Sequence, residues 1–155
     1  MAKLHTLTVP DMLWINLQLT GAPQAYNYAT LEEGTFYQYK TGQNHDFAKQ
    51  SARLLVGFAK LSPFAAGNPA TAFVGCLAFL EMNGNTLELS DGEADQWLEA
   101  VWFDPAQAPV LIAEKMRSYH THDKFGVPDC HGIVEGIIAR YTGTLEQLSN
   151  STAAA

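Results

Sequence analysis

The segment from Leu54 to Gly84 constrains the fold of this chain more than any other. Apolar residues recur with helical spacing before the Pro- and Gly-containing turn at 62–71 and again after it, as far as Met82. Asn68 followed by Pro69 predicts a helix start, because Asn caps free backbone N–H groups and Pro fits the first helical position. The second helix carries few charges, so we expect it to be the central buried helix.

Helix start signals recur along the rest of the chain. The capping-box spacing, in which a Ser or Thr precedes an acidic residue by three positions, occurs at Thr8, Thr30 and Ser90. The alternation in 86–89 indicates a short strand or an extended connector, and 22–29 and 120–129 are typical of loops. Together with residues 68–82, the predicted helices cover 9–20, about 30–39, 45–61, 91–102, 110–119 and 130–141.

These boundaries predict an all-α fold of six or seven helices with at most a short strand or hairpin. At 155 residues, with 47% hydrophobic and 16% charged residues, the chain is suited to one compact domain. We place this domain at residues 1–148 and predict a frayed tail at 149–155, which is small and polar.

The charge balance and the cysteine content of the chain indicate which binding partners and which cellular compartment to expect. Nine Lys and Arg against 16 Asp and Glu give a formal net charge of −7. This balance disfavours nucleic acid and anionic membranes, which require a basic surface. No segment approaches the length of a membrane span and no leader is evident. With only Cys76 and Cys130 as thiols, we expect a reduced, cytoplasmic protein.

The central turn resembles the motif region of the Fic/Doc family, and more closely its Doc (death on curing) branch. That motif reads His-Pro-Phe-x-Asp-Gly-Asn-Lys-Arg-Thr, and this chain has Ser62-Pro63-Phe64-Ala65-Ala66-Gly67-Asn68-Pro69-Ala70-Thr71. The resemblance covers about residues 7–103. It implies a bacterial, toxin–antitoxin-derived helical domain whose active relatives transfer a phosphoryl or nucleotidyl group to a protein hydroxyl.

The chain departs from the motif at the positions that the resemblance assigns to chemistry. Ser62 replaces the His that acts as general base, and losing such a base costs about 10²–10⁴ in rate. Ala66 replaces the Asp that holds Mg²⁺, and a methyl group is no metal ligand. Pro69 and Ala70 replace the Lys and Arg that bind phosphate, each a charge-assisted contact of about 1.5–3 kcal/mol. We therefore expect no cofactor and weak or absent nucleotide binding.

The motif positions that remain are those that shape the turn: Pro63, Phe64, Gly67, Asn68 and Thr71. Backbone N–H groups at the start of the second helix form a potential anion nest there, although Pro69 removes one donor. We favour the simpler interpretation, in which Asn68 serves only as a helix cap.

The sequence thus predicts a catalytically inactive Fic/Doc-like protein that acts as a binding or regulatory module with a protein partner or as a homo-oligomer. One alternative is a divergent transferase that uses Ser62 in a role other than base. A second is a metal- or small-ligand-binding protein that uses His120, His122 and His131, although their spacing matches no zinc pattern.

Three further features carry less weight. Five aromatic residues could frame a peptide groove, but we expect them to cover the core: Tyr26, Tyr28, Phe36, Tyr37 and Tyr39. Thr142 and Glu146 resemble part of the inhibitory helix of some Fic proteins, but Gln147 follows where that motif has Gly or Asn. His45 could in principle replace the missing base, but it lies a whole helix away from Ser62.

Overall fold

The computed structural model describes residues 4–39, 45–118 and 128–154, and the fold in these residues is all-α. Two strands of three residues each pair to form a small antiparallel sheet. No helix in these ranges is long and apolar enough to cross a membrane. The elements in order are α1 (Val9–Thr20), α2 (Tyr28–Phe36), α3 (Phe47–Leu61), α4 (Asn68–Met82), β1 (Asn85–Leu87), α5 (Asp91–Phe103), the 3₁₀ helix η1 (Pro105–Gln107), α6 (Ala108–Lys115), β2 (Met116–Ser118), α7 (Cys130–Arg140) and α8 (Thr142–Ala154).

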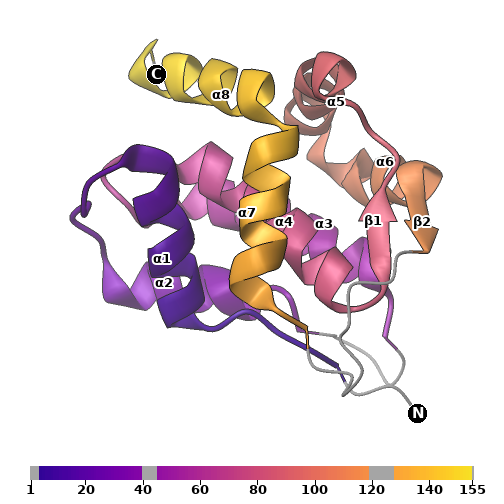
Figure 1. The fold of residues 1–155 in the computed structure, drawn as a ribbon, viewed down its shortest axis with the longest axis horizontal. Helices are drawn as coiled ribbons and strands as arrows, with labels where there is room; N and C mark the ends of the chain where they lie inside the picture. The colour runs from indigo at the N-terminus through magenta and orange to yellow at the C-terminus, as the bar shows by residue number, and fades with distance from the viewer. Residues whose placement is uncertain (1–3, 40–44, 119–127, 155) are drawn as a thin grey trace.

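Helix α4 is the centre of the domain, as its sequence predicts. All of its residues except Pro69 are buried. Helices α1, α3, α7 and α8 all pack against it, and Figure 1 shows it running through the middle of the molecule behind α7. A helix without a polar face is stable only when neighbours cover it on every side, which explains why the other elements are arranged around this one.

Local capping signals correctly predict several helix boundaries. At α1 the Thr8 hydroxyl accepts a hydrogen bond from the Asp11 N–H at 3.1 Å, and the Asp11 carboxylate accepts one from the Thr8 N–H at 2.8 Å. At α5 the Glu93 carboxylate accepts from the Ser90 N–H at 3.0 Å. These reciprocal contacts satisfy N–H groups that the helix itself leaves without partners.

Other predicted boundaries are wrong. Helix α2 begins at Tyr28 instead of Thr30, because Asn27 is its cap and accepts a hydrogen bond from the Thr30 N–H. The helix predicted over 110–119 ends at Lys115, where the chain becomes extended as β2 and pairs antiparallel with β1. The predicted break at 41–44 lies outside the described residues, as does the loop at 120–127.

Helix α8 is an element that the sequence reading did not predict. It follows α7 directly and extends to Ala154, into the segment 149–155 for which the sequence predicts a tail. With it, the described residues contain eight α-helices, one more than the upper number expected.

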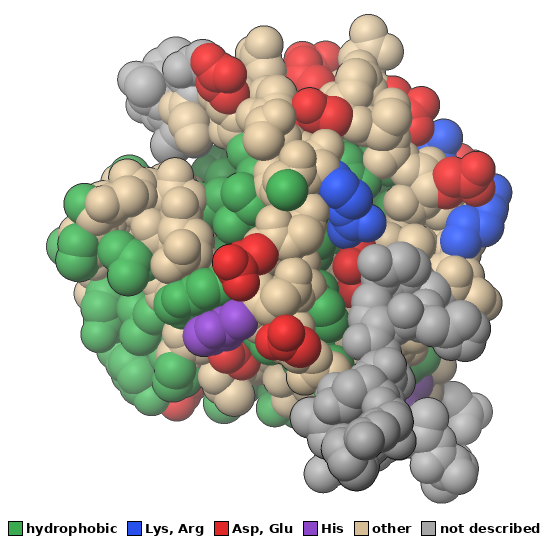
Figure 2. All heavy atoms as spheres, in the orientation of Figure 1, with side chains coloured by type: hydrophobic (Ala, Val, Ile, Leu, Met, Phe, Trp, Pro, Cys, Tyr) green, Lys and Arg blue, Asp and Glu red, His purple; other side chains and the backbone are tan. Residues whose placement is uncertain are grey.

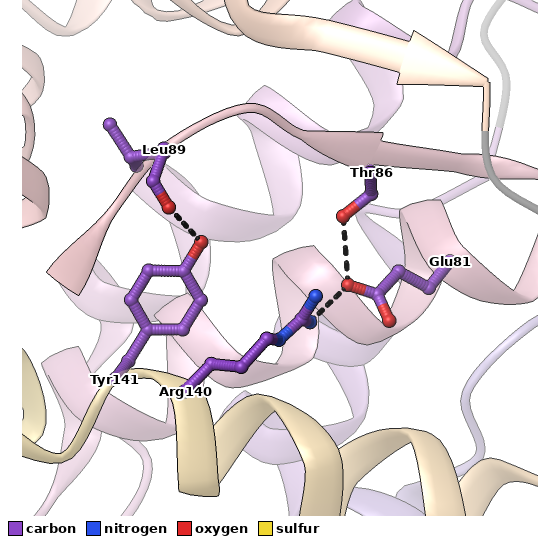
Figure 3. Close-up of polar contacts among 5 residues, drawn as sticks. All are labelled: Glu81, Thr86, Leu89, Arg140 and Tyr141. Carbon is purple, nitrogen blue, oxygen red and sulfur yellow. Dashed lines mark hydrogen bonds and ion pairs between the residues drawn. The ribbon is translucent and has the colours of Figure 1, made fainter.

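A polar cluster connects the end of α7 to α4 and to the segment that follows it (Figure 3). The Glu81 carboxylate, on α4 and 2% exposed, forms an ion pair with the Arg140 guanidinium and accepts a hydrogen bond from the Thr86 hydroxyl at 2.9 Å. Beside it, the Tyr141 hydroxyl donates to the Leu89 carbonyl oxygen at 2.5 Å. A buried carboxylate requires such partners, so these contacts fix the position of α7 against the core.

Candidate functional site

The loop between α3 and α4, residues 62–67, contains the motif positions. Ser62 ends α3 in the left-handed conformation, with φ 48° and ψ 58°, and is the only residue other than Gly with positive φ among those described. Its N–H donates to the Phe58 carbonyl oxygen, and its hydroxyl donates to that of Ala59 at 2.9 Å. The exposed Ser62, which the resemblance aligns with the general base of the Fic/Doc motif, therefore serves as a helix C-cap.

The structure corrects the predicted role of Asn68. Gly67, with φ 81°, is the N-cap of α4, and Asn68 is the first helical residue. The buried Asn68 side chain turns back into the loop, where its Oδ1 accepts from the Phe64 N–H at 2.9 Å and its Nδ2 donates to the Phe64 carbonyl oxygen at 2.8 Å. Both polar groups of the amide are thus used to hold the main chain of the loop instead of the free N–H groups of the helix.

A residue far away in the sequence holds the other half of the loop. Asn16, on α1, is 1% exposed, and its Nδ2 donates to the Ala66 carbonyl oxygen at 3.0 Å and to the Thr71 hydroxyl at 3.1 Å. The Thr71 N–H is also engaged, by the Gly67 carbonyl oxygen. The sequence analysis missed Asn16. It follows the core residue Met12 by four positions and so lies on the buried face of α1, which is the signal that it meets a polar group in the core.

The chain segment before α2 pairs with the motif loop. The Asn27 N–H donates to the Pro63 carbonyl oxygen at 2.9 Å, and the Ala65 N–H donates to that of Ala25 at 2.8 Å. Between them, Tyr26 and Phe64 form an antiparallel β-bridge with ring centroids 6.0 Å apart. The main chain of the loop is therefore held from three directions, by Asn68, by Asn16 and by residues 25–27.

The remaining motif positions differ in their surroundings. Ala66 and Pro69 are half-buried, whereas Ala70 is 2% exposed. A long cation at position 70 would therefore require a different arrangement of its neighbours. Gly67 allows close packing as well as positive φ, because a Cβ there would lie 2.7 Å from the Thr20 Cγ2.

A pocket of about 310 Å³ lies beside the motif loop. It is mainly apolar, and most of its lining residues come from α1 and from the loop between α1 and α2. The residues that line it are Leu13, Trp14, Asn16, Leu17, Pro23, Gln24, Tyr26 and Phe64. We call it the Trp14 pocket.

The Trp14 pocket lies in an exposed apolar surface. Leu17 is 37% exposed, Tyr26 48% and Tyr28 57%. Figure 2 shows hydrophobic side chains gathered at the left, over α1 and α2, whereas the Lys and Arg side chains on this face lie over its right half. The five aromatic residues were expected to cover the core. This expectation is wrong for four of them, because Tyr26, Tyr28, Phe36 and Tyr39 are all exposed.

A second pocket, of about 360 Å³, lies between α3 and the η1–α6 segment. Its lining residues are Tyr37, Ala52, Arg53, Val56, Gly57, Pro105, Ala106 and Pro109. The Tyr37 hydroxyl donates to the Glu33 carboxylate at 2.5 Å, and this hydrogen bond, together with burial, raises the pKa of Tyr37. The Arg53 guanidinium donates to the Tyr39 carbonyl oxygen and lies 5.8 Å from the Tyr37 ring centroid.

The histidines predicted as metal ligands are only partly described. His131 stacks on Trp14, with ring centroids 3.8 Å apart and an interplanar angle of 3°. His120 and His122 lie outside the described residues. Within 4–39, 45–118 and 128–154, no group of three or more His, Cys, Asp or Glu side chains is positioned to hold a metal ion.

Neither cysteine thiol is activated as a nucleophile. Burial raises the pKa of Cys76 to about 12, and burial together with the nearby Asp11 and Asp129 carboxylates raises the pKa of Cys130 to about 12. Both thiols are free. A reactive cysteine needs a lowered pKa, so neither residue is suited to nucleophilic catalysis.

No family model, curated protein or solved structure matches the chain. The resemblance to the Fic/Doc family therefore stays a prediction from the motif residues.

Proposed function

We propose that this protein is a catalytically inactive Fic/Doc-like module that binds a protein partner through the apolar surface over α1 and the loop before α2. The observation that carries this proposal is the Trp14 pocket with the exposed side chains around it, directly beside the motif loop. Exposed apolar surface of this kind is typical of sites for protein interaction.

The chemistry of the motif loop supports a binding role over transfer. Ser62 has no basic group near neutral pH and its hydroxyl is used to cap α3. Ala66, Pro69 and Ala70 supply neither a metal ligand nor a cation. Asn16 and Asn68 hold the loop by contacts that require no phosphate, so its shape persists without a nucleotide.

We extend the proposal to the biological setting that the resemblance implies, a cytoplasmic bacterial protein derived from a toxin–antitoxin system. The two free thiols, Cys76 and Cys130, agree with a reducing compartment. The negative charge makes nucleic acid an unsuitable partner.

The direct test of the inactive state is incubation of the pure protein with labelled ATP or GTP and cell extract. We expect no labelled protein band above that of extract alone. A labelled band that requires this protein would overturn the proposal in favour of the divergent transferase. Metal analysis of protein purified without a His-tag tests the second alternative, and stoichiometric metal would support it.

A further inference from the structure

One residue that lines the Trp14 pocket, Asn16, has a polar side chain and is only 1% exposed. Both of its N–H groups are used, because its Nδ2 donates to the Ala66 carbonyl oxygen and to the Thr71 hydroxyl. Its Oδ1 accepts no hydrogen bond from the described residues. This oxygen is not fully enclosed, so a ligand atom can reach it. The Ala66 contact fixes this orientation, since a carbonyl oxygen must face the amide nitrogen. The pocket thus offers an unused acceptor.

In this mainly apolar pocket, the Asn16 Oδ1 acceptor is best matched by a group that donates one hydrogen bond and has no acceptor of its own to be paired. Among apolar side chains only the Trp indole meets this requirement, since a Tyr hydroxyl also accepts and Leu and Phe have no polar atom. The size agrees, because about 310 Å³ lies at the lower end of ligand pockets and is suited to a single large side chain.

The walls of the pocket are suited to an aromatic ring. Trp14, Tyr26 and Phe64 line it together with the aliphatic Leu13 and Leu17, and aromatic pairs are stabilised beyond the area that they bury. Gln24, half-buried, is the other polar lining residue, and its Nε2 donates to the Ala22 carbonyl oxygen.

The charge of the protein indicates the character of the partner. No charged side chain of the described residues lines the pocket, and the chain as a whole has a formal net charge of −7. The cation nearest in sequence to the motif loop is Lys60, in the last turn of α3. A negatively charged protein favours encounter with a basic segment.

We propose that the Trp14 pocket binds the indole ring of a Trp residue in a basic segment of a partner protein, with the indole N–H donating to the Oδ1 of Asn16. This inference rests on the proposed function, because it names the anchor residue and charge of the partner. Large aromatic residues that fill a pocket commonly dominate the binding energy of protein interfaces.

Amide chemical-shift titration of the ¹⁵N-labelled full chain tests the indole claim. The probes are N-acetyltryptophanamide, its 1-methylindole derivative and N-acetylphenylalaninamide. We expect the first to shift resonances of α1, residues 21–27 and Phe64, and to bind at least about tenfold more tightly than the other two, since an unmet buried acceptor is costly. Equal affinities would overturn the role of Asn16, and shifts confined to other elements would overturn the pocket assignment.

A matched pair of variants distinguishes binding in the pocket from nonspecific binding to exposed apolar surface. Leu17→Gln places a polar group in the wall of the pocket, whereas Val110→Gln changes an exposed aliphatic residue on α6, 52% exposed, that does not line it. We expect at least about a tenfold loss of affinity for N-acetyltryptophanamide with the first and no change with the second, at unchanged circular dichroism. Equal effects of the two variants would overturn the assignment.

Three short peptides test the charge claim: one with a single Trp among Lys, Ser and Gly, one with Glu in place of Lys, and one with Ala in place of Trp. We expect only the first to bind, with an affinity that falls as salt rises. Equal binding of the acidic peptide would overturn the basic partner. Failure of all probes at α1 overturns this inference alone, whereas the labelled-nucleotide assay independently decides whether the protein is inactive.

Discussion

The carboxylate of Asp91, in the first turn of α5, accepts hydrogen bonds from both the backbone N–H and the hydroxyl of Thr144, in the first turn of α8, at 2.8 and 2.7 Å. Its second oxygen accepts from the Gly143 N–H at 3.0 Å. One acidic side chain thus caps a helix about fifty positions later in the chain. The Thr144 hydroxyl contributes most to lowering the pKa of Asp91, followed by the Thr144 N–H.

Replacing this cap is expected to weaken the docking of α8. Asp91→Ala removes all of these acceptors and leaves two N–H groups of α8 without partners, at a cost of about 0.5–2 kcal/mol in the free energy of unfolding. Urea denaturation measures the change. Glu99→Ala, at an exposed position on the same helix α5, is the control and is expected to change stability by less than about 0.5 kcal/mol.

The same contact predicts an acid-sensitive component of stability. Because the folded-state pKa of Asp91 lies below the ordinary value of an aspartate side chain, the carboxylate stabilises the folded state at pH values above that ordinary value and loses this effect as pH falls through the folded pKa. Asp91→Asn removes the titrating group. We therefore expect the stability difference between native protein and Asp91→Asn to be constant near neutral pH and to shrink below about pH 4. A difference that is independent of pH down to pH 2 contradicts this assignment.

The ion pair between the buried Glu81 carboxylate and Arg140, whose side chain is 42% exposed, predicts a larger effect. Arg140→Met leaves the Glu81 carboxylate, 2% exposed, with less charge compensation, and we expect a loss of about 3 kcal/mol in the free energy of unfolding. The matched control is Arg117→Met, which breaks the 2.7 Å pair with Glu88, where both side chains are more than half exposed. This control is expected to lose no more than about 1 kcal/mol. Similar losses in the two variants contradict the interpretation.

The loop contacts of Asn68 are testable in the same way. Asn68→Ala removes both hydrogen bonds to the Phe64 main chain and leaves buried polar groups unsatisfied, so we expect a loss of about 1–3 kcal/mol. Asn68→Asp keeps the acceptor but places a carboxylate against the Phe64 carbonyl oxygen, and it is also expected to destabilise the fold. If Asn68 acted only as an ordinary helix cap, as the sequence suggests, Asn68→Asp would be tolerated, since Asp caps as well as Asn does.

The sequence predicts those parts of the fold that local chemistry decides. The boundaries of α1 and α5 follow from reciprocal contacts within four residues, and the central position of α4 follows from its nearly uncharged sequence. The start of α2 was misplaced because two capping residues, Asn27 and Thr30, lie three positions apart and either is a suitable start.

The parts that the sequence did not predict depend on distant residues. Helix α8 begins where Asp91 accepts its N–H groups, and β2 exists because its residues pair with β1. The candidate site shows the same limit. The sequence correctly predicts a turn between the helices α3 and α4. The contacts of Asn16 and the pairing of 25–27 with 63–65 link residues 36 to 55 positions apart, which no local pattern records.

The most direct test of the central claim, that the motif loop is kept as scaffold without nucleotide chemistry, is calorimetric titration of the pure protein with ATP and GTP in the presence of Mg²⁺. Because Ala66, Pro69 and Ala70 stand where the Fic/Doc motif that this chain resembles has the metal ligand and two phosphate-binding cations, we predict no measurable binding up to about millimolar nucleotide. A micromolar dissociation constant for either nucleotide would contradict the account.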